Sequence, residues 1–400
     1  MRIAMLTNNY KPYMGGVPIS IEHLAEALRG LGHEVWIFAP TYKNQVEEEY
    51  VIRYPSFPFS VAKAPAPNVF SGIFEEKIIE LGIDIIHVHH PALVGNVALY
   101  LRKKYGIPVV FTYHTRFEAY LHYIKPLEWL KQGTGVLKRY MTWFCNQCDL
   151  IAAPTDGIKK YLLETGVRTK IEVLPTGVTE AAFYPQVEQV WQVRKHYKEN
   201  VDYLFCSVSR LAKEKNLDFQ LEGLKQVKEI LEQKGKTFRY LLIGDGPERE
   251  NLQKKIKANG LENEVILTGR IENAQVPAYQ KACDAFLFSS KSETQGIVIL
   301  EAMAAGNPVI AVKASGVEDM VVNGVNGYMT EENSNAWAKQ IVALMLDEER
   351  QKQVSYGAYA TATKYSENKI AERAAEAYNR TICDCHLEME CNTEHRWRFG

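Results

Sequence analysis

The chain has 400 residues, a formal net charge of −1 at pH 7, 46% hydrophobic residues and 24% charged residues, as is ordinary for a soluble globular protein. This length predicts two or three domains, and the near-neutral charge excludes a strong global attraction to nucleic acid. No apolar run approaches the roughly 20 residues that span a bilayer, and the first strand, residues 1–6, is too short for a signal peptide. We therefore expect a cytoplasmic protein.

Seven cysteines are scattered along the chain, and this odd count argues against a disulfide scaffold. Cys145 and Cys148 have the spacing of a redox pair but follow a long amphipathic segment, which favours structural thiols. A metal site near the C-terminus would use Cys383, Cys385 and nearby histidines. Their irregular spacing instead favours a mobile tail over residues 383–400.

The first half of the chain alternates short apolar runs with helical patterns. Each run is rich in β-branched residues, as buried strands are. Alternation of strands with helices predicts a parallel sheet with right-handed crossovers, so we expect a Rossmann-like domain over residues 1–178. The predicted strands are residues 2–6, 35–39, 83–87, 109–112, 150–153 and 171–174.

The loop after the first strand contains Gly15 and Gly16, which precede a predicted helix over residues 19–31. Paired glycines allow backbone N–H groups to approach a ligand closely, but they also suit a plain turn. The pattern is not G-x-G-x-x-G, so the dinucleotide fingerprint is absent. Both interpretations of this loop remain open.

Histidines gather at the end of two predicted strands. His87, His89 and His90 end one strand, and His114 directly follows the next. A zinc site is conceivable, but neither H-E-x-x-H nor a carboxylate-rich partner lies nearby in the sequence. We therefore expect polar residues that line a cleft between domains.

From Phe117 to Phe144 the chain is rich in tyrosine, tryptophan and leucine, with basic residues between them. Such a mixture suits an element that lies on a membrane surface. It equally suits an amphipathic helix that packs on its own sheet. The residues alone leave both interpretations open.

A second α/β series begins with a predicted strand over residues 203–208, after a polar stretch with the composition of a linker. Arg210 and Lys215 follow this strand and could clamp a diphosphate, the arginine through its fork and the lysine as a point charge. The next two strands end in a tight turn over residues 244–248 and in Gly269-Arg270-Ile271.

The segment 285–312 is a complete βαβ unit, with an apolar strand, a polar loop, a helix that Gly306 ends, and a second strand. Its loop lies at the carboxyl end of a strand, where open parallel sheets bind ligands. The N-terminus of the helix offers free N–H groups and a partial positive charge, which favour an anion.

Two carboxylates of this unit, Glu293 and Glu301, are eight residues apart. On a helix this spacing separates them by roughly 12 Å and turns them about 80° apart, whereas a glycosidase pair needs about 5–10 Å and a common focus. The spacing suits two separate contacts along one long ligand such as a nucleotide-sugar. The alternative is a surface helix with a solvated Glu301 and a capping Glu293.

In this order, Arg210-x4-Lys215, Gly244-Asp245-Gly246-Pro247-Glu248 and Glu293-x7-Glu301, followed by Ala302-Met303-Ala304-Ala305-Gly306-x-Pro308, resemble glycosyltransferase family 4 over about residues 1–380. The resemblance implies the α/β GT-B fold, in which two Rossmann-like domains with parallel sheets face each other across a cleft. An acceptor domain would cover residues 1–178 and a donor domain residues 179–364, and a helix over residues 365–382 would cross back to the first domain. The family is retaining and usually independent of metal, so we expect no cofactor.

The family's functional residues carry over to matching positions of this sequence. Arg210 and Lys215 would hold the donor diphosphate, Glu293 the donor sugar and Glu301 the ribose, and His114 would lie near the reacting sugar. The predicted catalytic residues are His114, Arg210, Lys215 and Glu293. The predicted donor-binding residues are Gly15, Gly16, Arg210, Lys215, Arg270, Ile271, Glu293, Thr294, Gln295, Gly296, Ile297, Val298 and Glu301.

Many members of the family have Glu-x-Phe-Gly where this chain has Glu293-Thr294-Gln295-Gly296. This version, together with Tyr113-His114-Thr115, is similar to the bacterial 1,2-diacylglycerol 3-glucosyltransferases. The resemblance implies a UDP-glucose donor, a diacylglycerol acceptor and a peripheral position on the anionic inner face of the cell membrane. The predicted acceptor and membrane residues are Tyr113, His114, Tyr120, Tyr123, Trp129, Lys131, Lys138, Arg139 and Trp143.

Three rival functions remain to be weighed. The same fold could act on a soluble glycan or small molecule, or the protein could bind a nucleotide-sugar without turnover. A dehydrogenase is disfavoured because the dinucleotide fingerprint is missing. We expect no nucleic acid and no obligate protein partner.

Overall fold

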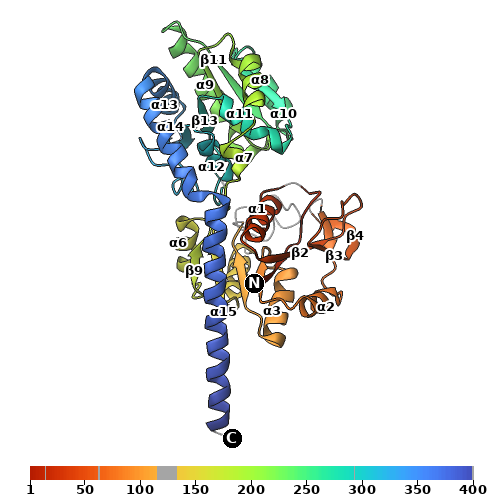
Figure 1. The fold of residues 1–400 in the computed structure, drawn as a ribbon. Helices are drawn as coiled ribbons and strands as arrows, with labels where there is room; N and C mark the ends of the chain where they lie inside the picture. The colour runs from red at the N-terminus through yellow and green to blue at the C-terminus, as the bar shows by residue number, and fades with distance from the viewer. Residues whose placement is uncertain (14, 62–63, 115–132, 292, 399–400) are drawn as a thin grey trace. The chain divides into compact units, whose positions relative to one another are not determined.

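The computed structural model describes residues 1–398 except 14, 62–63, 115–132 and 292, and it describes only the backbone of the remaining residues in 58–66, 133–134 and 388–398. The chain forms two compact units (Figure 1). Unit 1 comprises Met1–Gly177 and Glu367–Gly400, and unit 2 comprises Val178–Ser366. The two units are therefore built from three stretches of chain, because the C-terminal helix belongs to unit 1.

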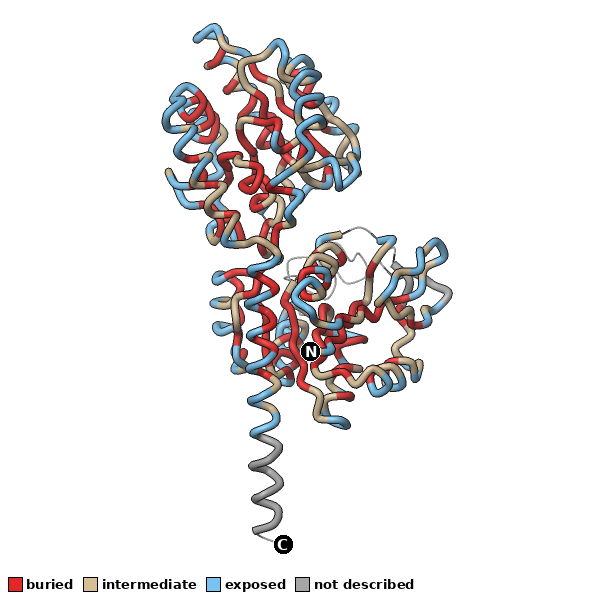
Figure 2. The backbone as a smooth tube through the Cα atoms, viewed as in Figure 1, coloured by how far each residue is buried: buried red, intermediate tan, exposed pale blue. Residues whose placement is uncertain are grey.

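Among the described residues of unit 1, seven strands form one parallel sheet in the order β3-β2-β1-β6-β7-β8-β9. Strands β6 to β8 are buried along their whole length, and β1 is buried after its exposed first residue, Arg2 (Figure 2), which explains why they read as apolar runs. A short antiparallel pair, β4 (Ser56–Val61) and β5 (Ala64–Pro67), lies apart from this sheet. The sheet strands are β1 (Arg2–Leu6), β2 (Glu34–Pro40), β3 (Val51–Tyr54), β6 (Ile85–Val88), β7 (Val109–Thr112), β8 (Leu150–Ala153) and β9 (Ile171–Val173).

Apolar cores lie on both faces of this sheet, as expected where helices cover a parallel sheet on two sides. Helix α6 shows how the sequence sets an element boundary, because the Thr155 side chain accepts a hydrogen bond from the backbone N–H of Ile158. The described helices of unit 1 are α1 (Gly16–Gly30), α2 (Ile73–Glu80), α3 (Val94–Tyr105), α5 (Gly133–Cys145), α6 (Asp156–Glu164) and α15 (Glu367–Arg398).

Helix α15 packs against α1 with alanines and Tyr378, and these residues share a core with β1 and β2. At its first residue the backbones come very close, since a Cβ on Gly177 would lie 2.5 Å from the Cα of Glu367. The helix runs without a break to Arg398, so the segment in which we expected a tail is helical as far as that residue. The mobility of this segment stays a prediction.

Among the described residues of unit 2, six strands form a parallel sheet in the order β12-β11-β10-β13-β14-β15. This order makes β10 and β13 neighbours although about 80 residues separate them in the chain, and it brings the loops at their carboxyl ends together. The strands are β10 (Tyr203–Val208), β11 (Phe238–Ile243), β12 (Val265–Gly269), β13 (Ala285–Phe288), β14 (Val309–Val312) and β15 (Gly327–Thr330).

The polar stretch before β10, which has the composition of a linker, forms two helices in unit 2. Ala182, Phe183 and Val193 of these helices belong to a core on one face of the sheet. The described α-helices of unit 2 are α7 (Glu180–Phe183), α8 (Val187–Lys198), α9 (Leu217–Glu232), α10 (Arg249–Ala258), α11 (Val276–Ala282), α12 (Ile297–Ala304), α13 (Ser334–Leu346) and α14 (Glu348–Ala362). Short 3₁₀ turns are η3 (Lys213–Lys215), η4 (Asn273–Gln275) and η5 (Thr363–Tyr365).

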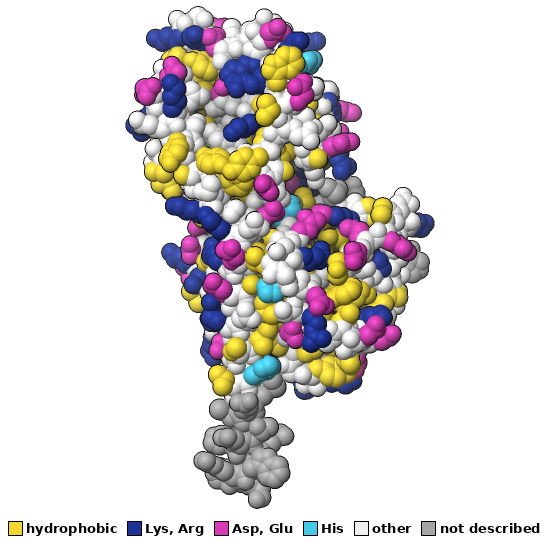
Figure 3. All heavy atoms as spheres, in the orientation of Figure 1, with side chains coloured by type: hydrophobic (Ala, Val, Ile, Leu, Met, Phe, Trp, Pro, Cys, Tyr) yellow, Lys and Arg dark blue, Asp and Glu magenta, His cyan; other side chains and the backbone are white. Residues whose placement is uncertain are grey.

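The visible surface mixes charges of both signs. On the face shown in Figure 3, lysine and arginine side chains alternate with aspartate and glutamate, in line with a net charge of −1. Within the described part of the chain, the helices are all too short or too polar to serve as a membrane span.

Candidate active site

In unit 2, the loop after β10 is fastened to the loop after β13. The hydroxyl of Ser289 lies 2.7 Å from the carbonyl oxygen of Lys215 and 3.0 Å from that of Asn216, and it donates to them. Asn216 has a positive φ of 53° and begins α9 directly after η3. These contacts hold the predicted phosphate-binding loop against the predicted sugar-binding loop.

The structure brings Lys215 and Glu293 together across these two loops. The Lys215 Nζ lies 2.5 Å from Glu293 Oε1, and the side chains are 22% and 20% exposed. Ser290 Oγ donates to the same carboxylate oxygen at 2.8 Å. A cation and a carboxylate therefore lie side by side, partly shielded from water, where their interaction is stronger than on an open surface.

The second predicted cation, Arg210, takes a different partner. Its guanidinium is 65% exposed and lies 2.7 Å from Glu214 Oε1, whose side chain is 12% exposed. Neither Glu214 nor Ser290 is among the predicted site residues. The four-residue spacing between Arg210 and Glu214 was the available signal for the first pair, whereas nothing in the sequence pointed to Ser290.

Two glycines are required where loops press on this site. Gly316 follows β14 and has a φ of +80°, and a Cβ there would lie 2.6 Å from the carbonyl oxygen of Glu293. Gly244 ends β11 with a φ of +134°, and a Cβ there would lie 2.0 Å from the carbonyl oxygen of Ser209. Any side chain at these positions would push the loops apart. The two glycines therefore allow the close backbone packing that positions the loops of Glu293 and Arg210.

Helix α12 begins beside Glu293. Gly296 precedes it with a φ of 70°, which only glycine adopts readily, and its carbonyl accepts from the Ile299 N–H at 2.8 Å. Ile297 and Val298 form the first turn, which carries no acidic residue to neutralise its free N–H groups. The N-terminus of α12 thus retains its partial positive charge close to Lys215.

The other predicted donor residues lie in two loops of unit 2. Gln295 is buried and Thr294 is half-buried in the same loop. Arg270 and Ile271 lie in the loop after β12, where Arg270 is exposed and Ile271 packs on the core beneath. They therefore end a strand of the same sheet, as the sequence predicts.

Glu301 lies within α12, and its burial raises the pKa of the carboxyl to about 7. Within the described residues, no hydrogen bond or ion pair to this carboxylate is formed. A half-buried carboxylate without a donor is well suited to accept hydrogen bonds from a ligand's hydroxyl groups.

In unit 1, the histidines that end β6 and follow β7 come together. His89 Nδ1 lies 2.8 Å from His114 Nε2, and their rings stack with centroids 5.1 Å apart. His87 lies behind them, with its ring centroid 4.2 Å from that of His89. Within the described residues, no group of three or more histidine, cysteine or acidic side chains could hold a metal ion.

His87 is held from two sides. Its Nε2 lies 2.6 Å from Thr112 Oγ1, and its Nδ1 lies 2.7 Å from the hydroxyl of Tyr378 on α15. Burial lowers the pKa of His87 and of His114 to about 3, and that of His90 to about 4, so these imidazoles are neutral at pH 7. The sequence analysis missed Tyr378, because a tyrosine on an amphipathic helix gives no signal of such a contact.

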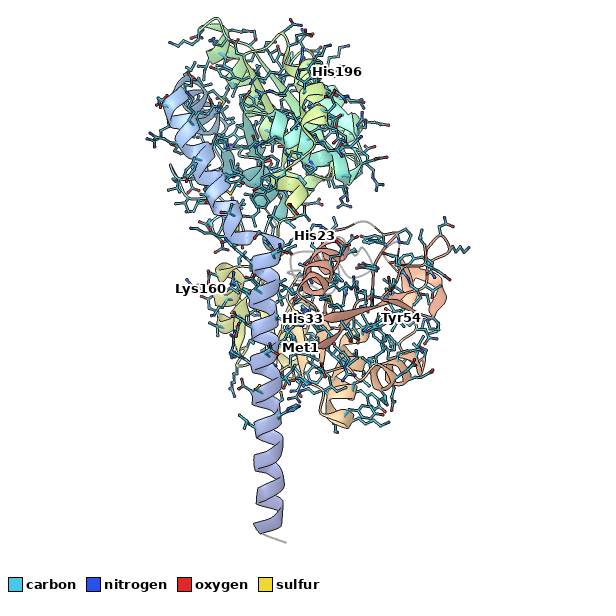
Figure 4. The ribbon with its side chains drawn as sticks, viewed as in Figure 1. Met1, His23, His33, Tyr54, Lys160 and His196 are labelled. Carbon is cyan, nitrogen blue, oxygen red and sulfur yellow. The ribbon has the colours of Figure 1, made fainter. Side chains whose placement is uncertain are left out.

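The histidines line a small cavity of about 30 Å³ within unit 1. Ser20 and His23 of α1 contribute to it, and Figure 4 labels His23 on this helix. Glu367 and Tyr378 contribute from α15. The cavity therefore combines neutral imidazoles with groups from the first and last helices of the chain.

Gly15 and Gly16 lie after β1 in the same unit. Gly15 is extended, with a φ of −174°, and Gly16 is the first residue of α1. A Cβ on Gly16 would meet no atom of the described residues within 4 Å, so none of their side chains occupies the space beside it. This leaves room for a ligand at the N-terminus of α1, although no packing constraint within the described residues demands a glycine there.

The predicted membrane residues divide into three groups. Tyr120, Tyr123, Trp129 and Lys131 lie outside the described residues. Lys138, Arg139 and Trp143 are exposed on α5, Trp143 by 49%. Tyr113 is only 1% exposed and packs in the core against Phe111, so it does not face outward as a membrane residue would, and a role at the acceptor stays a prediction.

Helix α5 has two distinct faces. Met141 and Phe144 enter the core, and the Tyr140 hydroxyl donates to the carbonyl of Pro91 at 3.0 Å. Val136 is 70% exposed and lies seven residues before Trp143, with Arg139 between them, so the three share the outer face. Apolar and cationic side chains thus occur together on a helix that the core holds in place.

Two parallel-sheet Rossmann-like units, with loops and charged residues at the carboxyl ends of the strands, define the GT-B fold of glycosyltransferases. The structure of Anabaena HepE in complex with UDP matches with a TM-score of 0.75 and 22% identity, over 95% of this chain and 100% of that chain. Sucrose-phosphate synthase from Thermosynechococcus elongatus matches with a TM-score of 0.76 and 20% identity, over 96% and 99%. These likenesses establish the fold.

The chain belongs to glycosyltransferase family 4, as its sequence matches show. Residues 14–181 match "Glycosyltransferase Family 4", and residues 190–361 match "Glycosyl transferases group 1". The alpha-monoglucosyldiacylglycerol synthase of Streptococcus pneumoniae is 32% identical over 321 residues, which are 78% of this chain and 71% of the relative. The enzyme of the same name from Acholeplasma laidlawii is 28% identical over 403 residues, with 97% of both chains covered.

Proposed function

We propose that this glycosyltransferase moves a hexose, with glucose as the first choice, from a UDP-sugar to the hydroxyl of diacylglycerol, with retention of configuration. The observation that carries the proposal is the cluster of Lys215, Glu293 and the free N-terminus of α12. The two relatives named alpha-monoglucosyldiacylglycerol synthase support this acceptor and sugar.

Each part of a nucleotide-sugar has a proposed partner among the predicted donor-binding residues. Lys215 and the α12 N-terminus would hold the diphosphate, because both are positive and fixed before the ligand arrives. Glu293 would accept hydrogen bonds from the sugar hydroxyls, and Glu301 from the ribose. Arg210 is exposed and lies near the start of the loop that carries Lys215, so its guanidinium can swing from Glu214 to the phosphate.

The reaction breaks the bond between the anomeric carbon and the diphosphate oxygen and forms a bond from that carbon to the acceptor oxygen. Negative charge develops on the leaving diphosphate, where Lys215, Arg210 and the helix N-terminus stabilise it. In the proposed retaining course, the acceptor attacks the face from which the diphosphate departs. The leaving phosphate oxygen then takes the proton of the acceptor hydroxyl.

These cationic groups supply the charge stabilisation for which other transferases use a metal ion. We therefore include in the proposal that turnover requires no metal. The groups that would stabilise the leaving diphosphate in place of a metal ion are Arg210, Lys215 and the backbone N–H groups of residues 296–298.

The proposal places the enzyme on an anionic membrane surface through the outer face of α5. Trp143 and Val136 offer apolar area at the depth where indole rings are favoured in a bilayer interface. Lys138 and Arg139 beside them would each add about 1 kcal/mol of attraction to an anionic leaflet. A lipid hydroxyl at the interface could then reach unit 1 without leaving the membrane.

The test compares Lys215→Met with Lys213→Met, a change of the same size at an exposed position two residues away in η3. Transfer from UDP-glucose to diacylglycerol in anionic vesicles is measured, and the anomeric configuration of the product is read by NMR. We expect Lys215→Met to lower kcat/KM at least about 100-fold, and Lys213→Met to stay within about threefold of the wild type. Near wild-type turnover by Lys215→Met would refute the assignment.

Relatives of lower identity motivate a second donor in the same assay. The GDP-mannose-dependent alpha-mannosyltransferase of Corynebacterium glutamicum is 26% identical over 352 residues. GDP-mannose is therefore included beside UDP-glucose, and soluble glycerol and simple sugars are included as acceptors. Higher turnover with GDP-mannose, or with a soluble acceptor and no vesicles, would replace the corresponding part of the proposal.

A further inference from the structure

His89 packs against two other imidazoles and contacts the candidate catalytic histidine directly. Its ring is tilted by 38° against that of His87, with centroids 4.2 Å apart, and it stacks on His114. Its Nδ1 is 2.8 Å from His114 Nε2. His89 is 2% exposed, so it is a buried support behind His114.

The contact between the two rings requires that one nitrogen donates and the other accepts, since burial keeps both imidazoles neutral. In a neutral imidazole, the nitrogen that does not carry the proton can only accept. Two arrangements are therefore possible. Either the Nδ1–H of His89 donates to His114, or the Nε2–H of His114 donates to His89.

The second nitrogen of His89 distinguishes these arrangements. Its Nε2 is buried and has no hydrogen-bond partner among the described residues. If His89 accepted at Nδ1, its proton would be on Nε2, and a buried N–H would be left without an acceptor. Orphaned N–H groups are the rarer kind of unpaired buried group in protein interiors. The structure therefore favours a proton on Nδ1 of His89, which donates to His114.

We infer that His89 is a positioning residue that fixes the orientation and the tautomer of His114. With its Nε2 accepting from His89, His114 must carry its own proton on Nδ1. His114 then acts toward the substrate as a hydrogen-bond donor and not as a base. Only the identity of the reaction in which His114 takes part rests on the proposed function.

The surrounding contacts hold His89 in this arrangement. The backbone N–H of His89 donates to the carbonyl of Leu6 at 3.0 Å, which fixes the end of β6 against β1. Behind it, His87 is bonded on both ring nitrogens, to Thr112 and Tyr378, and cannot turn without losing two contacts. The stack therefore leaves His89 little freedom to rotate and exchange its nitrogens.

The inference fits the proposed chemistry. A retaining reaction in which the leaving phosphate takes the acceptor proton needs no protein base beside the sugar. A neutral donor at His114 could instead bind a sugar hydroxyl at its oxygen atom.

The test reads the tautomer of His114 directly by long-range ¹H–¹⁵N NMR of the histidine rings, with His114→Gln used for assignment. We expect the Nδ1–H form of His114 in the wild-type protein and in His89→Asn, whose side-chain amide can still donate. In His89→Leu we expect this form to be lost. An Nε2–H form in the wild type, or an unchanged spectrum in His89→Leu, would overturn the inference whether or not the protein turns over diacylglycerol.

Kinetics give a second readout. We expect His89→Leu to lower kcat at least tenfold with an unchanged KM for the donor, and His89→Asn to recover to within threefold of the wild type. The control is His33→Leu, at the turn after α1, where the ring contacts the N-terminal amine of Met1 (Figure 4). A structural defect in His89→Leu would be visible as a lower Tm, and equal losses in His89→Asn and His89→Leu would contradict a role in donation.

The pH profile supplies the last check. The titratable groups around His114 are His23, His87 and His89 in the cavity, His90 beside it, and Glu367 and Tyr378 from α15. Because His114 acts as a neutral donor, His114→Gln should leave the shape of the kcat profile between pH 6 and 8 unchanged. The inference would be refuted if kcat of the wild type fell below about pH 6.5 and this fall were absent in His114→Gln, because His114 would then act as a base.

Discussion

Replacement of Glu301 by glutamine tests the most perturbed carboxyl in unit 2. Burial raises the pKa of this carboxyl from 4.5 to about 7, with no compensating partner among the described residues. Glutamine has nearly the same shape but never ionises. The substitution therefore removes the cost of a buried charge and, at the same time, removes an acceptor for ligand hydroxyls.

The sign of the effect on stability follows from the raised pKa. The folded protein holds the Glu301 proton more tightly than the unfolded chain does, so this stabilisation is complete below pH 4.5 and is lost as pH rises through about 7. A pKa rise from 4.5 to about 7 corresponds to about 3 kcal/mol at most. Relative to the wild type, Glu301→Gln should therefore gain up to about 3 kcal/mol of stability between pH 4.5 and pH 8.

The affinity for the donor should rise with pH, whereas the stability of the wild type falls. With a pKa of about 7, roughly one tenth of Glu301 is ionised at pH 6 and roughly nine tenths at pH 8. If the ionised carboxylate binds the ribose, the affinity of the wild type for UDP-glucose should rise about tenfold over this range. UDP-glucose is the suitable probe because its diphosphate is a diester and does not titrate there.

Urea unfolding at pH 5 and pH 8, and calorimetric titration with UDP-glucose at pH 6 and pH 8, measure both effects on the same two proteins. The wild type should be destabilised at the higher pH and bind more tightly, whereas Glu301→Gln should change little in either respect. If Glu301→Gln is no more stable than the wild type at pH 8, the carboxyl is not buried as described. If the two proteins share one pH dependence of binding, Glu301 does not contact the donor.

Three further predictions concern the loops, the membrane and the metal. In urea unfolding, Gly316→Ala should lose about 2–4 kcal/mol of stability, because a Cβ there would clash with the Glu293 carbonyl, and its KM for the donor should rise. The control Gly235→Ala, with a φ of +65° and open space around it, should lose about 1 kcal/mol. The double variant Arg139→Ala and Trp143→Ala should bind anionic vesicles about tenfold more weakly in flotation, whereas the exposed Tyr356→Ala of unit 2 should bind as the wild type does. Prolonged treatment with EDTA followed by gel filtration should leave the turnover of UDP-glucose unchanged, and restoration of lost activity by Mg²⁺ or Mn²⁺ would contradict the proposal.

Strands whose two faces are both buried could be predicted from the sequence. β6, β7, β13 and β14 are four residues long and buried at every position, so they stand out as apolar runs. The strands at one edge of each sheet, β3 and β15, were not predicted. β15 begins at Gly327, where a Cβ would lie 2.2 Å from the carbonyl oxygen of Val309, so the glycine serves close strand packing.

The sequence names candidate site residues, whose roles stay predictions, but it does not predict their contacts. Lys215 meets Glu293 only because the sheet order makes β10 and β13 neighbours, and strand order depends on tertiary packing. The contact between His89 and His114 arises in the same way from the pairing of β6 and β7. The burial of Tyr113 was not predicted for a local reason, because the side chain that follows a buried strand can still point into the core.

The pair formed by Lys215 and Glu293 also bears on which ligands the site can accept. With no ligand, each charge satisfies the other, and Ser290 supplies a further donor to the carboxylate. An inorganic anion that attracted Lys215 would leave Glu293 partly shielded and without its cation, which costs free energy. A nucleotide-sugar avoids this cost, because its diphosphate can replace the carboxylate beside Lys215 while its hydroxyls replace the ammonium beside Glu293. The ion pair therefore favours a ligand that carries an anion and adjacent hydroxyl donors in one molecule over either group alone.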